Sequence, residues 1–569
     1  MLTPWGAALD ENSILQEYPR PQLRRESYLN LNGRWDCAFT PDAEPPERFD
    51  ETILVPFSPE AELSGVRRAL EPGEYLWYRR RVRLPEGFKR ARLLLHFGAV
   101  DQLAEVFVNG TSVRRHTGGC TPFSADITDA VGSGGEFELS VRVQDFTEAL
   151  PLARGKQSTR PGGIWYTAQS GIWQTVWLES VPENYIKGLR LIPHFDEKAL
   201  EVWVAGEGEC RAVIDGVQEH SFTAGAPAVL PVGELEPWSP ETPRLHELTL
   251  TLGEDRAESY FAMRKFTAEK AEDGEMRLFL NGKPYFHNGL LDQGYWPDGL
   301  MTAPSDDALI FDIQTAKAMG FNTLRKHMKC ESLRWYYHCD RLGMIVWQDM
   351  PSGGGKYSSA AVSLPLVTGH HMRDNRYRAL ARSDEAGRRQ FVSELREMVG
   401  ALYNCPCIAM WVPFNEGWGQ FDAAEICAML KRLDPTRLVD HASGWHDQGA
   451  GDVCSRHVYF KKYRFRPDGD GRAVVLSEYG GYNFRIEGHS QSKKDFGYRR
   501  FSSANSYRFA LRDLFRGEIA AARAEGLAAA IYTQLSDVEG ETNGLVTYDR
   551  RFLKIPAVLM KGIAEVKND

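Results

Sequence analysis

The stretch CIAMWVPFNEGWGQ, residues 407–420, contains the segment that decides the fold. Residues 407–414 form a continuous apolar run, which is typical of a strand covered on both faces in a parallel sheet. The run ends in an amide, a carboxylate and two glycines that bracket a tryptophan. The stretch therefore predicts a buried strand that carries polar groups to one edge of its sheet.

Short apolar runs alternate with long amphipathic ones after residue 266, a pattern typical of βα repeats. Eight strands are predicted, at residues 284–292, 321–327, 344–350, 407–416, 437–445, 454–460, 473–481 and 527–537. Helices are predicted at residues 305–320, 330–343, 384–404, 421–434, 505–526 and 555–566. Eight repeats over roughly 300 residues match a (β/α)8 barrel, in which the helices after the fifth and sixth strands are expected to be short or irregular.

The chain before the barrel is expected to form two β-domains. Residues 1–180 contain short aromatic and β-branched runs between Gly, Pro and Asp, which predict a sandwich of antiparallel strands. Residues 181–266 repeat this pattern on a smaller scale and fit an immunoglobulin-like sandwich. Within them, residues 236–245 contain three prolines and are predicted to be a loop. Residues 267–569 remain for the barrel.

Composition excludes several classes of protein. A net charge of −9 and a pI near 5.9 argue against nucleic acid as a partner, because phosphate backbones require a basic surface. The sequence begins without a secretory signal pattern and has no apolar run of the ~20 residues that span a bilayer, so a soluble cytoplasmic protein with no membrane partner is expected. The nine cysteines lack a CxxC pair, which favours reduced, buried thiols over a metal site, and no cofactor is expected.

In a barrel of this kind the active site lies at the carboxyl ends of the strands. The polar residues that close the predicted strands are Asp292, Arg325, His327, Asp349, Asn415, Glu416, Trp445, His457, Tyr459, Glu478 and Asp537. We expect them to form a convergent polar ring. For Asp292 and Asp537, an ordinary polar strand end explains the pattern equally well.

Two glutamates suggest the chemistry. Glu416 follows the fourth predicted strand and Glu478 the seventh, so their side chains can face each other across the barrel mouth. Retaining glycoside hydrolysis needs two carboxyls ~5–5.5 Å apart, one as nucleophile and one as acid and then base. The alternative is a pair of salt-bridged residues that stabilise the barrel rim.

The two carboxyls need opposite environments, since the proton donor must stay neutral near pH 7. Apolar walls from Trp411, Phe414 and Trp418 are expected to raise the pKa of Glu416.

The nucleophile must remain an anion. We expect Arg325 and the Tyr459 hydroxyl to hold Glu478 in that state, and Asn415 to donate a hydrogen bond to the sugar 2-hydroxyl. These neighbours complete a predicted donor site for one sugar.

Aromatic side chains near strand ends fit sugar binding, because the CH faces of a pyranose pack on flat rings. The candidates are Trp296, Trp418, Trp445 and Tyr482. Trp165 and Trp173, in the first β-region, are expected to be structural.

The sequence resembles glycoside hydrolase family 2, the β-galactosidase and β-glucuronidase family, over nearly its whole length. In the β-regions the similar segments are LNGRWDCAF, YLWYRRRVRLPE, VFVNG, GGIWYTAQSGIWQTVWLE and YFAMRKF. In the barrel they are LFLNGKPYFHNGLLDQGYWPDG, GFNTLRKHMK, WVPFNEGWG and LSEYGGY. The resemblance implies a jelly-roll sugar-binding domain, an immunoglobulin-like domain and a barrel. It also implies an exo-acting, retaining enzyme with Glu416 as general acid/base and Glu478 as nucleophile.

Departures from the family pattern bear on the substrate. Family β-glucuronidases usually carry an Asn-x-Lys motif near the last strand, whereas Asn543 is followed here by Gly544 and Leu545. The ion sites of the large metal-dependent β-galactosidases are not expected.

Basic residues cluster after the second and seventh strands and could meet a sugar carboxylate. They are Arg325, Lys326, Lys329, Arg485, Lys493, Lys494, Arg499 and Arg500. For the residues after the seventh strand, the alternative is that their charges lie on solvent-exposed loops and bind no substrate.

The sequence thus predicts an exo-β-glycosidase that acts on a small carbohydrate or glycoconjugate with a terminal β-linked hexose or hexuronic acid, as a β-galactoside, β-galacturonide or β-glucuronide. A noncatalytic carbohydrate-binding protein and a transglycosylase with the same residues remain alternatives. A homo-oligomer is compatible with the sequence.

Overall fold

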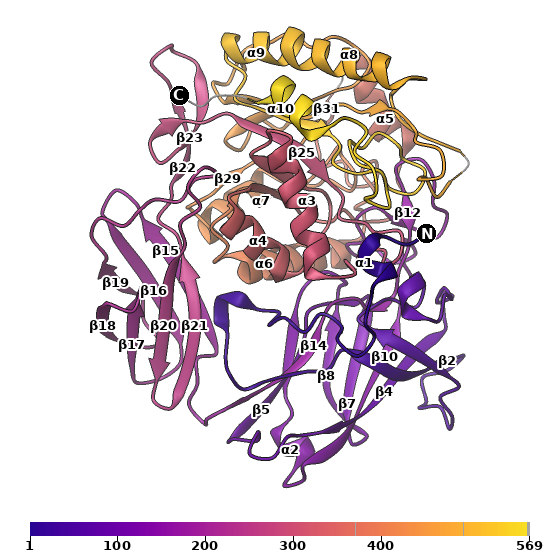
Figure 1. Ribbon diagram of the computed structural model, residues 1–569, viewed down its shortest axis with the longest axis vertical. Coiled ribbons are helices and arrows are strands. Elements are labelled where there is room, and N and C mark those ends of the chain that lie inside the picture. The colour runs from indigo at the N-terminus through magenta and orange to yellow at the C-terminus, as the bar shows by residue number, and fades with distance from the viewer. Residues whose placement is uncertain (370, 493, 566–569) are drawn as a thin grey trace.

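The computed structural model describes residues 1–369, 371–492 and 494–565. It has three regions (Figure 1). The N-terminal β-region, in indigo, lies below the barrel, the second β-region, in magenta, lies beside it, and the barrel with its helices fills the centre and top.

The first region is a sandwich of two sheets, which we call the N-terminal sandwich. One sheet contains, in order, β1 (Tyr28–Asn30), β14 (Val176–Val181), β5 (Arg92–Phe97) and β9 (Phe123–Asp126). The other contains β3 (Glu51–Val55), β2 (Gly33–Thr40), β4 (Tyr75–Arg83), β10 (Glu136–Gln144), β7 (Leu103–Val108) and β8 (Thr111–Thr117). In β10 every second residue is buried, as expected for a strand with one face on a core. The predicted antiparallel strands are confirmed.

The second region has two smaller antiparallel sheets. They contain β15 (Gly188–His194), β16 (Ala199–Ala205) and β19 (Ala228–Pro231), and β18 (Gln218–Thr223), β17 (Glu209–Ile214), β20 (His246–Leu252) and β21 (Asp255–Phe261). The predicted loop at residues 236–245 contains no strand. A small sheet that was not predicted leads into the barrel, with β22 (Phe266–Lys270), β23 (Met276–Leu280) and β24 (Lys283–Pro284).

The third region is an eight-stranded parallel sheet, and all eight predicted strands are confirmed. In spatial order they are β29 (Leu438–Val439), β28 (Ile408–Val412), β27 (Ile345–Asp349), β26 (Thr323–Lys326), β25 (His287–Asp292), β34 (Ala529–Thr533), β31 (Ala473–Gly480) and β30 (Val453–Val458). In the part of the chain that is described, β29 and β30 form no ladder with each other, so the barrel is nearly closed.

The predicted helices are α3 (Asp306–Ala318), α4 (Leu333–Leu342), α6 (Glu385–Leu402), α7 (Ala423–Leu433) and α10 (Ala557–Ala564), and the long segment near residue 515. Ser305 caps α3 by accepting a hydrogen bond from the Ala308 amide. The long segment is divided into α8 (Ala504–Leu514), a π-helical turn (Phe515–Ile519) and α9 (Ala520–Glu525). No helix occurs in residues 440–452 or 459–472, as expected after the fifth and sixth strands. Helix α5 (Ser359–Thr368), which contains Pro365, was not predicted.

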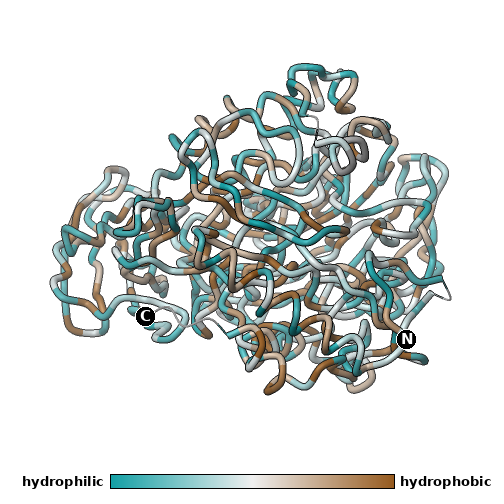
Figure 2. Tube along the Cα trace, turned by 90° about the horizontal axis from the view of Figure 1, so that it is seen from above, coloured by the Kyte–Doolittle hydropathy of each residue, from teal (hydrophilic) through white to brown (hydrophobic). Residues whose placement is uncertain are grey.

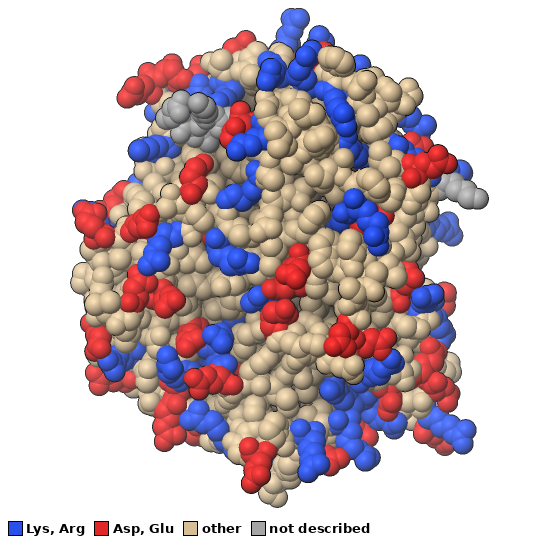
Figure 3. Space-filling view, in the orientation of Figure 1, with Lys and Arg blue, Asp and Glu red and all other residues tan. Residues whose placement is uncertain are grey.

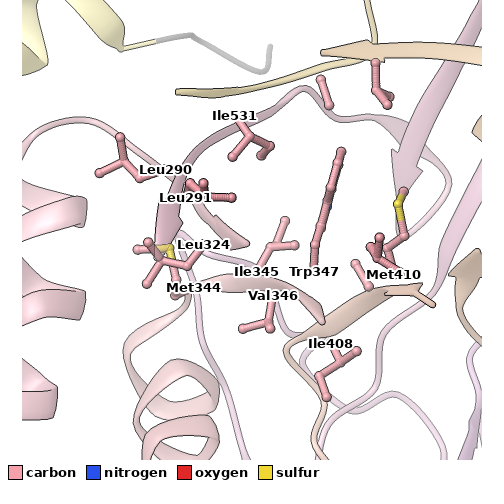
Figure 4. Packing of buried hydrophobic residues seen from close by; sticks show 14 of the residues in the cluster. Leu290, Leu291, Leu324, Met344, Ile345, Val346, Trp347, Ile408, Met410 and Ile531 are labelled. Carbon is pink, nitrogen blue, oxygen red and sulfur yellow. The ribbon is translucent and has the colours of Figure 1, made fainter. Parts of the chain in front are cut away.

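Buried apolar side chains fill the barrel (Figure 4). Leu290 and Leu324 from β25 and β26 pack near Ile345, Trp347 and Ile531 from β27 and β34. Fully burying one such side chain contributes ~1.5–3 kcal/mol. Figure 2 shows hydrophobic segments running through the middle of the molecule.

The surface and the thiols agree with the composition. All nine cysteines are buried and carry free thiols. Within the described ranges, every helix is too short or too polar to cross a bilayer. Basic and acidic side chains are interspersed over the face shown in Figure 3, without a continuous basic area.

Candidate active site

The WVPFNEGWGQ stretch places Glu416 at the barrel rim in a left-handed backbone conformation, with φ +48°. The Glu416 amide donates to the Ser443 carbonyl at 2.8 Å, which joins the loops after β28 and β29. The two glycines are required by close packing. A Cβ on Gly417 would lie 2.5 Å from the His446 ring, and one on Gly419 would lie 2.1 Å from the Gly353 carbonyl oxygen.

Glu478, near the end of β31, is held by a cation and a hydroxyl. Arg325 Nη1 donates to Glu478 Oε1 at 3.1 Å, and the Tyr459 hydroxyl donates to Oε2. Arg325 also donates to both oxygens of Asp349, at 2.9 and 3.0 Å, and to Asn415 Oδ1 at 2.8 Å. Burial alone would lower the pKa of Arg325, but Asp349 and Glu478 raise it above its ordinary value. Arg325 therefore stays cationic beside Glu478.

The two glutamates face each other. One carboxylate oxygen of Glu416, one of Glu478 and a ring nitrogen of His457 all lie within 4.8 Å of one another. This separation fits the ~5–5.5 Å between the carboxyls of a retaining glycoside hydrolase and is shorter than the ~6.5–9.5 Å of an inverting one. The same three side chains are also of types that bind metal ions. Arg325 and Tyr459, however, already engage both oxygens of Glu478.

His457 stands between the two acids. Its Nδ1 lies 2.7 Å from Glu416 Oε1, and its Nε2 lies 3.6 Å from Glu478 Oε1. Ser443 directs its hydroxyl proton to Ser477, at 2.9 Å, so its oxygen can accept from His457 Nε2 at 3.0 Å. His457 therefore links Glu416 to the Ser443 hydroxyl through its two ring nitrogens.

The expected rise in the pKa of Glu416 is wrong. Burial raises this pKa, but the hydrogen bond and charge of His457, the charge of Lys156 and the Trp418 indole together bring it below its ordinary value. Trp418 was expected to form an apolar wall, but its Nε1 donates a hydrogen bond to Glu416 Oε2 at 3.3 Å.

Trp411 and Phe414 do not wall the carboxyl either, because both face the surrounding helices. Trp411 Nε1 donates to Asp434 Oδ2 at 2.9 Å, and the Phe414 ring stacks on Phe391 of α6 with 5.3 Å between centroids.

An aromatic group flanks Glu416 and corrects the expectation for Trp165. The Trp418 ring lies 5.0 Å from Trp165 and 5.0 Å from Tyr357, centroid to centroid. Trp165 comes from the N-terminal sandwich, so this domain forms part of the site's wall. Trp173 is buried, and its Nε1 donates to the Gly119 carbonyl, as expected for a structural residue.

Other predicted site residues are divided between the mouth and the interior. His327 Nδ1 lies 2.8 Å from Asp349 Oδ2, and burial, with the charge of Lys156, holds the pKa of His327 well below its ordinary value. The Trp445 ring lies 5.4 Å from that of His457.

Asp292 and Asp537 lie at or just beyond strand ends, but each forms a buried ion pair, with Lys326 at 2.7 Å and with Lys554 at 2.6 Å. Their substrate-binding roles stay predictions.

The basic cluster is only partly at the mouth. Lys326 and Lys329 bind Glu331 at 3.3 and 2.5 Å and are buried, so they do not offer free charge to a sugar. Lys494, Arg499 and Arg500 are exposed, and Arg485 is half-buried between β32 (Tyr482–Asn483) and β33 (Arg499–Arg500). Lys493 lies outside the described residues.

Two of the proposed sugar-facing rings are enclosed. Trp296 is 1% exposed and packs against Trp5 and Arg550. Tyr482 is 7% exposed and packs against Phe501. Their proximity to strand ends did not place them on a sugar-binding surface.

Four side chains near the acids were not predicted as site residues: Lys156, Tyr357, Ser443 and Tyr498. Tyr498 stacks on Tyr459 with 3.8 Å between centroids. Ser443 lies near the end of the predicted strand at residues 437–445, so its position was a signal that could have been used. In the sequence, Lys156 and Tyr498 lie far from any predicted strand end of the barrel, and no pattern marks them.

A (β/α)8 barrel with two facing carboxyls at its mouth has the geometry of a glycoside hydrolase. The family model "Glycosyl hydrolases family 2, sugar binding domain" matches residues 67–182, and "Glycosyl hydrolases family 2, TIM barrel domain" matches residues 273–479. Together they cover more than half of the chain, which belongs to glycoside hydrolase family 2.

Individual relatives share about a quarter of their residues with this chain over the aligned segments. A β-galactosidase of Thermoanaerobacter pseudethanolicus is 25% identical over 393 residues, 63% of this chain and 48% of the relative. A β-glucuronidase of Rattus norvegicus is 24% identical over 444 residues, 68% of this chain and 63% of the relative. The chain therefore spans less than two thirds of either relative.

Solved structures share the fold over nearly the whole chain. A β-D-glucuronidase of Dictyoglomus thermophilum has a TM-score of 0.75 at 19% identity, over 96% of this chain and 98% of that one. A galacturonate-bound β-galacturonidase of Eisenbergiella tayi has a TM-score of 0.72 at 19% identity, over 97% and 99%. These TM-scores show that the chains share a fold.

Proposed function

We propose that the protein is a retaining exo-β-glycosidase that removes a terminal β-linked hexose or hexuronic acid. The observation that carries this proposal is the pair Glu416 and Glu478, whose oxygens lie within 4.8 Å of each other. The names of the relatives, β-galactosidase, β-glucuronidase and β-galacturonidase, support the same range of sugars.

In the first step Glu478 attacks the anomeric carbon as the glycosidic bond breaks, and Glu416 gives a proton to the departing oxygen. Arg325 and Tyr459 each donate a hydrogen bond to one oxygen of Glu478 and hold the carboxylate in position for this attack. The product is a glycosyl ester on Glu478 and a free alcohol.

In the second step Glu416 removes a proton from water, which attacks the same carbon and releases Glu478. Two inversions give net retention. The first step needs a proton on Glu416, and His457, whose Nδ1 lies 2.7 Å from Glu416 Oε1, is the neighbour that can exchange a proton with it. This pairing reconciles an acid role with a Glu416 pKa below its ordinary value.

A mechanism-based test is to trap the ester. A 2-deoxy-2-fluoro β-glycoside with an activated leaving group forms the ester readily and hydrolyses it slowly, because fluorine disfavours the oxocarbenium-like transition state. We expect a mass increase of one sugar on the peptide that contains Glu478, and none in Glu478→Gln. A label on another carboxylate would refute the assignment. Absence of turnover and of label with every sugar tested would leave the noncatalytic binding protein as the better reading.

Transglycosylation uses the same residues and differs only in the acceptor. Product analysis with added alcohol or sugar acceptors separates it from hydrolysis.

A further inference from the structure

A segment of the N-terminal sandwich is fixed against the barrel mouth. Ala153 pairs with Gly353 in an antiparallel bridge, and the amides of Arg154 and Gly155 donate to the Ser352 carbonyl at 2.8 and 2.9 Å. Gly155 has φ +61°, and a Cβ there would lie 2.3 Å from the Met328 carbonyl oxygen. The next residue, Lys156, is thus delivered to the barrel by contacts that only glycine permits.

The same part of the sandwich extends beyond its two sheets. Strand β12 (Tyr166–Thr167) lies beside the barrel (Figure 1), where the Tyr166 hydroxyl donates to Glu541 and the Thr167 amide donates to Glu539 at 2.7 Å. Met328, which Gly155 contacts, is adjacent to His327, and its sulfur lies 3.7 Å from Asn415 Nδ2. Lys156 therefore stands within the shell of residues around the two acids.

Lys156 is a largely enclosed lysine that forms no ion pair with a described residue. Four lysines are buried in the described part of the chain, and Lys326, Lys329 and Lys554 each bind a carboxylate, at 2.7, 2.5 and 2.6 Å. Lys156 is 8% exposed, and no described residue forms a hydrogen bond or ion pair with its ammonium. Its nearest recorded contact is the Tyr166 ring, 5.7 Å from Nζ. The Nζ atom keeps contact with solvent, so an anion that enters the mouth can reach it.

The charge of Lys156 acts on the donor site. It lowers the pKa of Glu416, after the larger effects of burial and His457, and it lowers the pKa of His327, after the effect of burial. Neither acid of the pair can serve as its partner, because Glu416 is engaged by His457 and Glu478 by Arg325. An anionic group on the bound sugar would supply the missing counterion.

We propose that Lys156 binds the carboxylate of a terminal uronic acid, so that the substrates are β-hexuronides. This inference rests on the proposed glycosidase function. The sugar carboxylate would then be bound by a lysine of the N-terminal sandwich. Lys326 and Lys329 would not bind it, because they form ion pairs with acidic residues inside the barrel. The competing reading is that Lys156 only adjusts the protonation of Glu416.

The test compares Lys156→Met and Lys156→Arg with Lys187→Met, a matched control at an exposed site in the second β-region. Nitrophenyl β-galacturonide and β-glucuronide are compared with the β-galactoside and β-glucoside. We expect kcat/KM of Lys156→Met to fall about 100-fold on the preferred uronide, the usual scale for losing one partner of a buried charge pair, and to change little on neutral sugars. Lys156→Arg should retain most of the uronide activity, and Lys187→Met all of it.

Three outcomes overturn the inference while the proposed function survives. These are wild-type preference for neutral sugars, equal losses of Lys156→Met on uronides and neutral sugars, and a shift of its pH profile on all substrates without a change in sugar preference. If no β-glycoside of the panel is cleaved, the proposed function itself fails.

A binding measurement gives a second readout. Free galacturonate or glucuronate should raise the Tm of wild-type protein more than galactose or glucose does, and this difference should vanish in Lys156→Met. Without ligand, Lys156→Met should have a nearly unchanged Tm, because the Lys156 ammonium forms no hydrogen bond or ion pair that the variant would remove. A lower Tm with an unchanged ligand response would identify Lys156 as structural and refute the inference.

Discussion

Replacing His457 by leucine is expected to move the high-pH limit of activity upward. His457 is the largest influence that lowers the pKa of Glu416, through a hydrogen bond of 2.7 Å and its charge, while burial of Glu416 opposes it. A hydrogen bond to a charged group contributes ~1.5–3 kcal/mol. Because this hydrogen bond favours the ionised form of Glu416, its loss should raise the pKa of Glu416. The protonated acid then persists to higher pH.

The assay is kcat/KM against pH on an alkyl β-glycoside, whose poor leaving group depends on protonation. His457→Asn is the matched control, because its amide can still donate to Glu416 without a charge, and we expect a smaller shift. Trp445→Phe, which changes the other ring beside His457, should leave the high-pH limb in place. A limb that stays fixed or moves to lower pH in His457→Leu would refute the assigned effect of His457 on Glu416.

Three further predictions concern other parts of the molecule. Glu416→Ala should reduce turnover of alkyl glycosides far more than that of activated aryl glycosides, and equal losses would contradict its role as acid. Gly417→Ala should lower the free energy of unfolding by about 1–3 kcal/mol in denaturant titrations, because φ is +71° and the new Cβ would meet the His446 ring; an unchanged midpoint would show that the loop relaxes freely. The pKa of Asp306 is lowered to about 2 despite burial, chiefly by His338 and Arg334, so its ion pairs should stabilise the fold above about pH 4 and lose this effect as pH falls toward 2. The difference in Tm between wild type and Asp306→Asn should therefore be constant near neutrality and shrink in acid, and a difference that grows in acid would contradict the assignment.

The strands of the barrel could be predicted because each is a short apolar run that ends in polar residues. Residues 407–414 and 473–476 are buried throughout, as a parallel sheet between helices requires. The π-helical turn at Phe515–Ile519 and helix α5 could not be predicted, since neither departs from ordinary composition in a way that fixes its hydrogen bonds. Residues 482–483 and 499–500, which pair as β32 and β33, are too short to give a pattern.

The two acids and most of their neighbours could also be predicted, because position at a strand end determines the edge at which a side chain lies. The direction in which an aromatic side chain points at that edge could not be predicted. Trp411 and Phe414 face helices, whereas Trp418 binds Glu416 through its indole nitrogen, and this difference reverses the expected pKa shift. Lys156 and Trp165 reach the site across a domain boundary, a contact between residues about 250 positions apart for which one sequence offers no signal.

The docking of residues 152–156 on the loop after β27 separates two tasks between different stretches of the chain. The two facing carboxyls belong to the barrel, while Lys156 and Trp165 belong to a domain with its own core. A change in this connecting segment can therefore alter sugar preference through Lys156 while the two carboxyls stay in place. Related enzymes with this arrangement can diverge in substrate preference through residues that lie outside the barrel.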